Sequence, residues 1–181
     1  WNSMIELTHI DTARLQALER LLHAEIPLSR AMQVRVLRFD RNGLALGAAL
    51  APNLNHKKTA FGGSLNSLAT LACWGLIQLL RPEPAKPAMT VVIQESRVQF
   101  LKPVARDFEA VCALPPAHKL EKFLNMLERK GRARLELEAG IPASNAMALS
   151  FQGRFVAYER TRFPGFEPIG ETIDENQTNP H

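Results

Sequence analysis

The chain has only two cysteines among its 181 residues, too few for a small secreted fold held together by several disulfides. Cys73 and Cys112 both fall in apolar segments, so we expect two buried thiols, as in proteins of the reducing cytoplasm. No uninterrupted apolar run approaches the roughly 18 residues of a membrane-spanning helix, and the first residues lack a secretory pattern. The five histidines have no metal-ligand spacing, so no metal site is expected: His9, His23, His56, His118 and His181.

The chain also lacks a large excess of either charge, because its formal net charge is only +4. Basic residues are spread out, and the basic run at residues 129–134 is followed by two glutamates, Glu136 and Glu138. We interpret this pattern as a solvated face, with an acidic partner as the alternative. No nucleic-acid partner is expected, because the chain shows no binding motif and no basic stripe interleaved with aromatics.

The composition, 46% apolar and 22% charged, is typical of a globular protein, and no linker divides the chain. We expect a single domain over residues 1–163. Residues 164–181 contain few apolar side chains and are expected to form a disordered tail. Because Trp1 is an unusual first residue, Met4 is the expected natural start and residues 1–3 an addition.

The periodicity of apolar residues predicts an alternating series of helices and strands. Helices are expected at 11–25, 62–80 and from 115–116 to a stop at Gly131, and strands at 32–39, 44–50, 89–101, 107–114, 132–139 and 146–158. Pro27 is expected to close the first helix, and Asn42-Gly43 to form a hairpin turn. Pro82, Pro84 and Pro87 prevent the second helix from continuing.

The 62–80 helix is apolar over much of its circumference, which indicates that other elements surround it. Strands joined by short turns favour an antiparallel sheet. The predicted fold class is therefore α+β, with a curved antiparallel sheet wrapped around one long central helix.

The loop before this helix holds most of the information about function. Three polar residues, Asn55, His56 and Thr59, are followed by Gly62 and Gly63 at the helix start. A helix N-terminus presents unpaired N–H groups and positive dipole charge, and glycine allows close approach of another molecule. These features predict a seat for a carbonyl oxygen that gains negative charge during a reaction.

The element order and the string from Asn55 to Leu65 resemble those of the hotdog-fold acyl-thioester enzymes. The string is most similar to the thioesterase domain that in some bacteria follows a GNAT-type acetyltransferase domain and elsewhere stands alone. The segment 100–104, with Asp107, matches the strand-turn-strand after the central helix of many hotdog proteins, and the resemblance covers about residues 10–160.

The resemblance implies a homodimer or homotetramer with active sites between subunits. It also implies a substrate carried as a thioester on coenzyme A or on the phosphopantetheine of acyl carrier protein, with no other cofactor. Acyl carrier protein is acidic, which would give Lys57, Lys58 or the basic residues of 119–134 an electrostatic use.

One side of the central helix collects Gly62, Asn66, Thr70 and Cys73, with Ser67 near its edge, and this side has no Asp or Glu. In the common His-Gly-Gly thioesterase subgroup, a carboxylate occupies the position of Thr70 and a histidine that of Phe61. Base-assisted hydrolysis would therefore need another group. Glu95 is one candidate, with a surface charge as its alternative role, and His56 is the other, with a role in loop geometry as its alternative.

Decarboxylation of a malonyl thioester requires neither nucleophile nor strong base, only donors for the enolate oxygen and a poorly solvated place for the carboxylate. The Asn55 amide and the N–H groups of residues 61–63 are the candidate donors. The resemblance implies this activity on malonyl-acyl carrier protein, giving acetyl-acyl carrier protein for fatty acid synthesis. We favour it over thioester hydrolysis, and a non-catalytic acyl-thioester binding module is the third hypothesis.

The predicted site thus has two groups of residues. The catalytic group is Asn55, His56, Gly62 and Gly63, and the substrate-binding group is Thr59, Phe61, Ser64, Asn66 and Thr70. Structural roles remain open for several of them: Asn55 as a loop brace, Thr59 and Ser64 as helix caps, and the two glycines as close-packing positions.

Overall fold

The computed structural model describes residues 11–80 and 89–159. The expected start at Met4, the three prolines at 82, 84 and 87 and the expected tail at 164–181 lie outside the described residues. The helices are α2 (Thr12–Glu25), α3 (Pro27–Ala31), the 3₁₀ turn η2 (Ala51–Asn53), α4 (Gly62–Leu79) and α5 (Ala117–Lys130). The strands are β1 (Arg35–Asp40), β2 (Gly43–Ala48), β3 (Met89–Phe100), β4 (Phe108–Cys112), β5 (Arg132–Ala143) and β6 (Ala146–Glu159).

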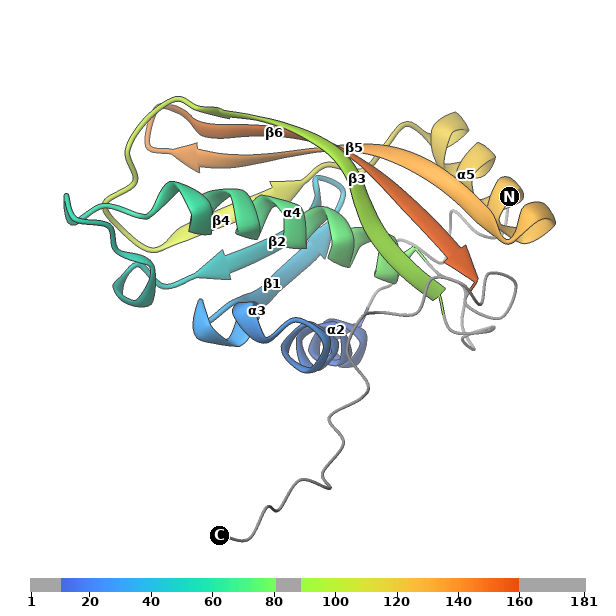
Figure 1. Ribbon diagram of the computed structural model, residues 1–181, viewed down its shortest axis with the longest axis horizontal. Helices are drawn as coiled ribbons and strands as arrows, with labels where there is room; N and C mark the ends of the chain where they lie inside the picture. Colours follow the sequence, from blue (N-terminus) through green and yellow to red (C-terminus); the bar gives the residue numbers. More distant parts are fainter. Residues whose placement is uncertain (1–10, 81–88, 160–181) are drawn as a thin grey trace, which may run out of the picture.

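The strands form one antiparallel sheet in the order β1-β2-β4-β5-β6-β3. The sheet curves over α4, which lies along its inner face (Figure 1). This is the hotdog fold, so the predicted fold class is confirmed. β1 and β3 are the two edge strands of the sheet.

Helix α4 is the centre of the core because its apolar residues extend around most of its circumference. Ten of its residues are buried, and the helix packs against β2, β4 and β5. Burying a Leu or Ile side chain contributes about 1.5–3 kcal/mol, so α4 and the sheet stabilise each other. No helix in the part of the chain that the structure describes is long and apolar enough to cross a membrane.

The side chains of strand β5 alternate between the inner and the outer face of the sheet. Its odd-numbered residues, such as Leu135 and Leu137, are buried, whereas Arg134 and Glu136 are exposed on the outer face. This alternation was predicted, but the predicted end at residue 139 was wrong, because β5 continues to Ala143. Pro142 is accommodated there by a register shift against β6.

The N-terminal region departs from the sequence prediction at Pro27. Helix α2 begins as expected, with the Asp11 side chain accepting from Arg14 N–H at 2.9 Å. Pro27, however, opens the short helix α3 instead of ending the helical region, because proline suits the first turn of a helix. Strand β1 consequently starts at Arg35, later than the predicted residue 32.

The β1–β2 hairpin turn was predicted at Asn42-Gly43. Arg41 and Asn42 connect the paired residues Asp40 and Gly43, and only Gly43 has positive φ, +114°. The Asn42 N–H donates to the Asp40 side chain at 2.7 Å. The two loop residues are therefore Arg41 and Asn42, and Gly43 is the first residue of β2, where it adopts the positive φ that the turn requires.

Candidate functional site

The loop between η2 and α4 is closed by its own hydrogen bonds. Leu54 and Ala60 form an isolated bridge, and Asn55 N–H donates to Thr59 O at 2.8 Å. Lys58 takes positive φ, +61°, at the turn. The loop is thus a small, defined hairpin at the end of the molecule where α4 begins (Figure 1).

The Asn55 side chain is the internal brace of this loop. Its Nδ2 donates to Thr59 Oγ1 at 2.9 Å and to Ala60 O at 3.3 Å. Its Oδ1 accepts from the N–H groups of Lys57, at 2.8 Å, and Thr59, at 3.2 Å. Both amide hydrogens and the oxygen are used, which matches the loop-brace alternative and leaves the amide no free hydrogen to donate to a substrate in this conformation.

His56 is exposed at the tip of the same loop. Within residues 11–80 and 89–159 no hydrogen bond joins His56 to another side chain or to the helix start. The structure therefore does not bring it together with Gly62 and Gly63.

Sequence reasoning missed a second anchor of the loop, Asn53. This side chain is only 2% exposed, and its Nδ2 donates to Met32 O at 3.0 Å and to Ala49 O at 2.7 Å. The backbone carbonyl oxygen of Asn53 accepts from Phe61 N–H at 2.7 Å, which positions the residue just before α4. The only sequence signal was a Pro-Asn pair after a strand, which is too common to single out.

The first N–H groups of α4 have no cap. The first helical bond at this end runs from Leu65 N–H to Phe61 O at 3.1 Å, and Phe61, at the N-cap position, offers no side-chain acceptor. The N–H groups of Gly62, Gly63 and Ser64 precede that bond and are not capped by another residue of the described chain. These three donors, rather than the Asn55 amide, form the available oxyanion seat.

Two exposed aromatic rings border these donors. A Cβ atom at Gly63 would lie 2.2 Å from the Phe61 ring, and one at Gly62 would lie 3.3 Å from the Phe100 ring. Phe61 is 56% exposed and Phe100 is 55% exposed. The glycines therefore make room for the rings, and the rings give the seat an apolar rim.

The face of α4 that follows the seat is polar and half-buried. Asn66, Ser67 and Thr70 lie on it, and Thr70 Oγ1 donates to Asn66 O at 3.0 Å within the helix. Asn66 Oδ1 is buried but has no hydrogen-bond partner among the described residues. A buried acceptor without a donor is uncommon, and it identifies Asn66 as a group available to a ligand.

Further along the same face, Cys73 is a buried free thiol, as was predicted for both cysteines. Its side chain is fully buried, and desolvation, together with the neighbouring Cys112 thiol, raises the pKa of Cys73 well above its ordinary value. Trp74 closes this end of the face, its Nε1–H donating to Val91 O at 3.2 Å. Cys73 is therefore a core residue with an inert thiol.

Glu95, the carboxylate named as a candidate base, does not belong to the seat at the start of α4. Glu95 lies on the outer face of the sheet, where Arg154 Nη1 binds it at 2.9 Å, so its surface role is correct and its role as base is not. Asp107 accepts from Leu50 N–H at 2.8 Å and joins two loops. Among the described residues, no group of three or more His, Cys, Asp and Glu is arranged to hold a metal ion.

The chain matches one family model and is similar to solved structures of known proteins. The model of the family described as "Putative thioesterase (yiiD_Cterm)" matches residues 15–159. A protein of unknown function from Chlorobaculum tepidum is similar over 80% of this chain and 93% of its own, with 31% identity and a TM-score of 0.72. A putative thioesterase from Shewanella oneidensis is similar over 80% of this chain and 96% of its own, with 28% identity and a TM-score of 0.69.

Proposed function

We propose, from the premise that this chain belongs to the putative thioesterase (yiiD_Cterm) family, that it processes an acyl thioester at the start of α4. The reaction we favour is decarboxylation of malonyl-acyl carrier protein to acetyl-acyl carrier protein, which supplies acetyl groups for fatty acid synthesis. Membership of this family indicates that the chain acts on thioesters. The choice of reaction rests on the chemistry of its own residues.

The single observation that supports decarboxylation is the composition of the seat. It offers the uncapped N–H groups of Gly62, Gly63 and Ser64, but α4 carries no carboxylate. Amide donors stabilise an oxyanion without any proton transfer, whereas activating water for hydrolysis requires a base. The residues present suit the reaction that needs donors alone.

In the proposed reaction, the bond between the malonyl carboxylate and the α-carbon breaks and carbon dioxide leaves. The electron pair forms an enolate whose negative charge rests on the thioester oxygen, held by the N–H groups at the helix start. The α-carbon then takes one proton from water, which gives the acetyl thioester. The apolar rings of Phe61 and Phe100 limit hydration of the carboxylate and so favour its loss.

Each remaining residue has a role that its contacts allow. Asn55 is a positioning residue, because it braces the loop that carries Phe61. Thr59 acts in the same way, while Asn66, Ser64 and Thr70 orient the malonyl group from the half-buried face. His56 is exposed at the tip of the loop and has no hydrogen bond to the seat, and we propose it as a ligand contact or proton donor from there.

Thioester hydrolysis is the second candidate, and the family description favours it. Here the same donors would hold a tetrahedral oxyanion, and His56 would activate water. A binding module that holds an acyl carrier protein without turnover is the third.

We further propose a cytoplasmic homodimer, or a tetramer of two dimers, that uses acyl carrier protein or coenzyme A thioesters. The two free, buried thiols are consistent with a reducing compartment. The dimer is supported by β3, an edge strand of 12 residues on which both faces are exposed over most of residues 93–100. Such an edge is normally covered by another chain or protected against pairing.

The test is incubation with malonyl-acyl carrier protein, followed by mass spectrometry of the carrier and a free-thiol assay. Decarboxylation predicts a carrier lighter by carbon dioxide with no release of thiol. Thiol release without the acetylated carrier would assign hydrolysis, and tight binding without either product would assign a binding module.

A further inference from the structure

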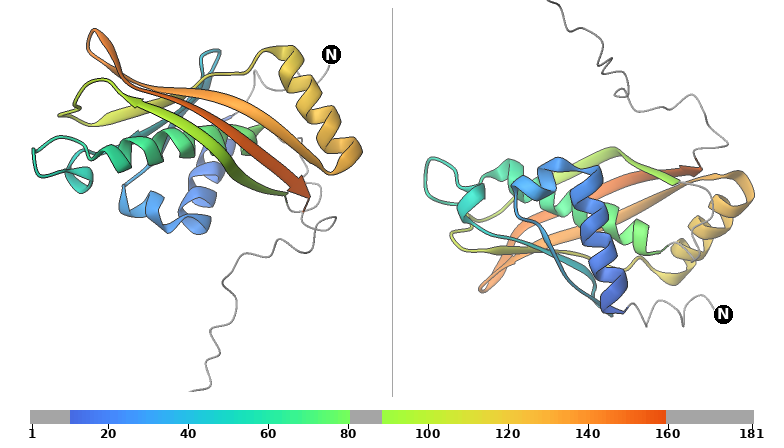
Figure 2. Two further views of the ribbon diagram at one scale, coloured as in Figure 1. Left: turned by 45° about the horizontal axis from the view of Figure 1, so that its top comes forward. Right: turned by 90° about the horizontal axis from the view of Figure 1, so that it is seen from below.

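Helix α5 lies beside the sheet at the end away from the start of α4 (Figure 2). A groove of about 790 Å³ is lined by α5 and by residues of β5 and β6. Among the described residues, its charged lining contains a single carboxylate, that of Glu136. The cationic side chains that line it come from both walls: Lys119, Lys122, Lys130, Arg132, Arg134 and Arg154. A groove with this imbalance attracts an acidic ligand.

The helix that forms one wall separates its charges by face. At 100° per residue, Lys119, Lys122 and Lys130 fall within about 80° of one another. Glu121 and Glu128 lie on the opposite side of the helix, and neither lines the groove. The positive charge of α5 is therefore directed into the groove and not cancelled within it.

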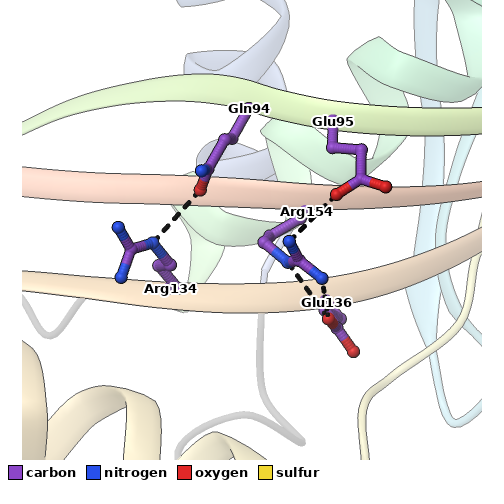
Figure 3. Close-up of polar contacts among 5 residues, drawn as sticks. All are labelled: Gln94, Glu95, Arg134, Glu136 and Arg154. Carbon is purple, nitrogen blue, oxygen red and sulfur yellow. Dashed lines mark hydrogen bonds and ion pairs between the residues drawn. The ribbon is translucent and has the colours of Figure 1, made fainter.

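The cations differ in how they are engaged. Arg154 is neutralised by Glu95 at 2.9 Å and by Glu136 at 3.0 Å, and Arg134 Nε donates to Gln94 Oε1 at 3.1 Å (Figure 3). Within the described part of the chain, no ion pair neutralises Lys119, Lys122 or Lys130. These exposed lysines are the groups available to a partner.

The groove also has an apolar component. Phe123 is buried in its wall, and Met126, half-buried, lies on the same helical face as the lysines. Helix α5 spans 14 residues, about 21 Å, so the groove is long enough for several helical turns of a partner. Cationic sides above an apolar floor fit an acidic amphipathic helix, whereas stacking of nucleic-acid bases would require exposed aromatic rings.

We propose that this groove docks an acidic helix of the carrier protein that bears the thioester substrate, an inference that rests on the proposed function. In one protomer the groove and the seat lie at opposite ends of the sheet. Arg132 pairs with Tyr158 and Met89 with Glu159 at the groove end, while Phe100 reaches Gly62 at the seat end. The 18 residues of α4 span about 27 Å between these ends.

The proposed dimer resolves this separation. If two β3 edges pair antiparallel about a two-fold axis, the start of α4 in the second copy lies at the groove end of the first. A carrier docked on one protomer then presents its substrate to the site of the partner subunit.

The test compares two substrates, malonyl-carrier protein and malonyl-pantetheine, which lacks the protein. The double variant Lys119→Glu/Lys122→Glu is expected to lower the ratio of their kcat/KM values, carrier over pantetheine, by about tenfold or more, because charge reversal weakens a steered encounter. Binding of holo-carrier without an acyl group should weaken to a similar extent, and in the wild type it should weaken as salt is raised.

The matched control is Arg20→Glu/Arg41→Glu, which changes net charge by the same amount at exposed positions on α2 and in the hairpin turn. It should leave the ratio unchanged. An unchanged ratio in the lysine variant, or an equal fall in the control, overturns the groove assignment even where the wild type decarboxylates. A carrier affinity that rises at least about tenfold when residues 164–181 are deleted would assign the groove to that acidic segment instead. If the carrier binds in a lysine-dependent way but is not turned over, the proposed reaction is wrong and the groove assignment stands.

Discussion

At the scale of single residues, the role of each polar side chain depends on whether its atoms already have hydrogen-bond partners within the protein. Asn55 and Asn66 are both half-buried amides near the start of α4, yet their situations are opposite. The Asn55 amide is fully engaged by its own loop, whereas Asn66 Oδ1 has no partner in the described chain. Removing the Asn55 side chain should therefore destabilise the loop, whereas removing the Asn66 side chain should lower only the activity.

The variant Asn66→Ala is expected to lose about 10²-fold in decarboxylation rate, the typical effect of losing one polar group that orients a transition state. Its free energy of unfolding in urea should stay within about 0.5 kcal/mol of wild type or rise, because no Oδ1 hydrogen bond is lost. Ser67→Ala, the next residue of the helix, is the control. A drop in stability equal to the drop in activity would show that Asn66 is structural.

For Asn55→Ala we expect faster tryptic cleavage after Lys57 or Lys58, because the side chain holds both ends of their loop. Losing these hydrogen bonds should also lower stability by about 1–3 kcal/mol. Asn55→Asp keeps the two accepted bonds and should be cleaved at an intermediate rate. Loss of activity with wild-type proteolysis would restore Asn55 as a direct donor to the substrate.

At the scale of elements, glycine positions decide how closely strands and helices approach. In the β1–β2 hairpin, a Cβ at Gly43 would lie 1.9 Å from the Cys112 carbonyl oxygen of β4, and Gly43 also has φ of +114°. Gly47, in the same strand, would meet only the side chain of Leu37, at 2.9 Å. Leu37 is 48% exposed and can rotate away.

We therefore predict that Gly43→Ala destabilises the fold by about 3 kcal/mol, since backbone strain and a clash with main-chain atoms add. Gly47→Ala, with an exposed and rotatable neighbour, should cost under about 1 kcal/mol. Urea denaturation monitored by Trp74 fluorescence measures both. Equal effects would mean that the hairpin tolerates a side chain at either position.

At the scale of the whole molecule, the unpaired β3 edge predicts self-association. The chain has a mass of 20.2 kDa, and light scattering should give about twice this value for the dimer. Ile93→Lys, on β3, should weaken the dimer at least about tenfold, because charges on an edge strand oppose pairing. Leu37→Lys, on the opposite edge strand β1, is the matched control. Dissociation by Leu37→Lys alone would place the interface at the other edge.

The order of elements and the buried α4 could be predicted because both follow from local periodicity. The position of Pro27 could not, since proline both ends one helix and opens the next. The burial of Cys73 and Cys112 could be predicted as well, because both fall in apolar segments. The role of Asn55 stayed undecided because its partners are mostly backbone atoms of its own loop, which sequence patterns do not display.

The central claim is that the N–H groups at the start of α4 hold the oxygen of a thioester. The chain has only 10 glycines, so selective ¹⁵N-glycine labelling gives a spectrum that Gly→Ala variants can assign. On titration with a non-reactive malonyl-thioester analogue, the amide protons of Gly62 and Gly63 should shift downfield while those of Gly140 and Gly153, on the sheet, stay in place. Binding of the analogue with Gly62 and Gly63 unmoved would contradict the claim.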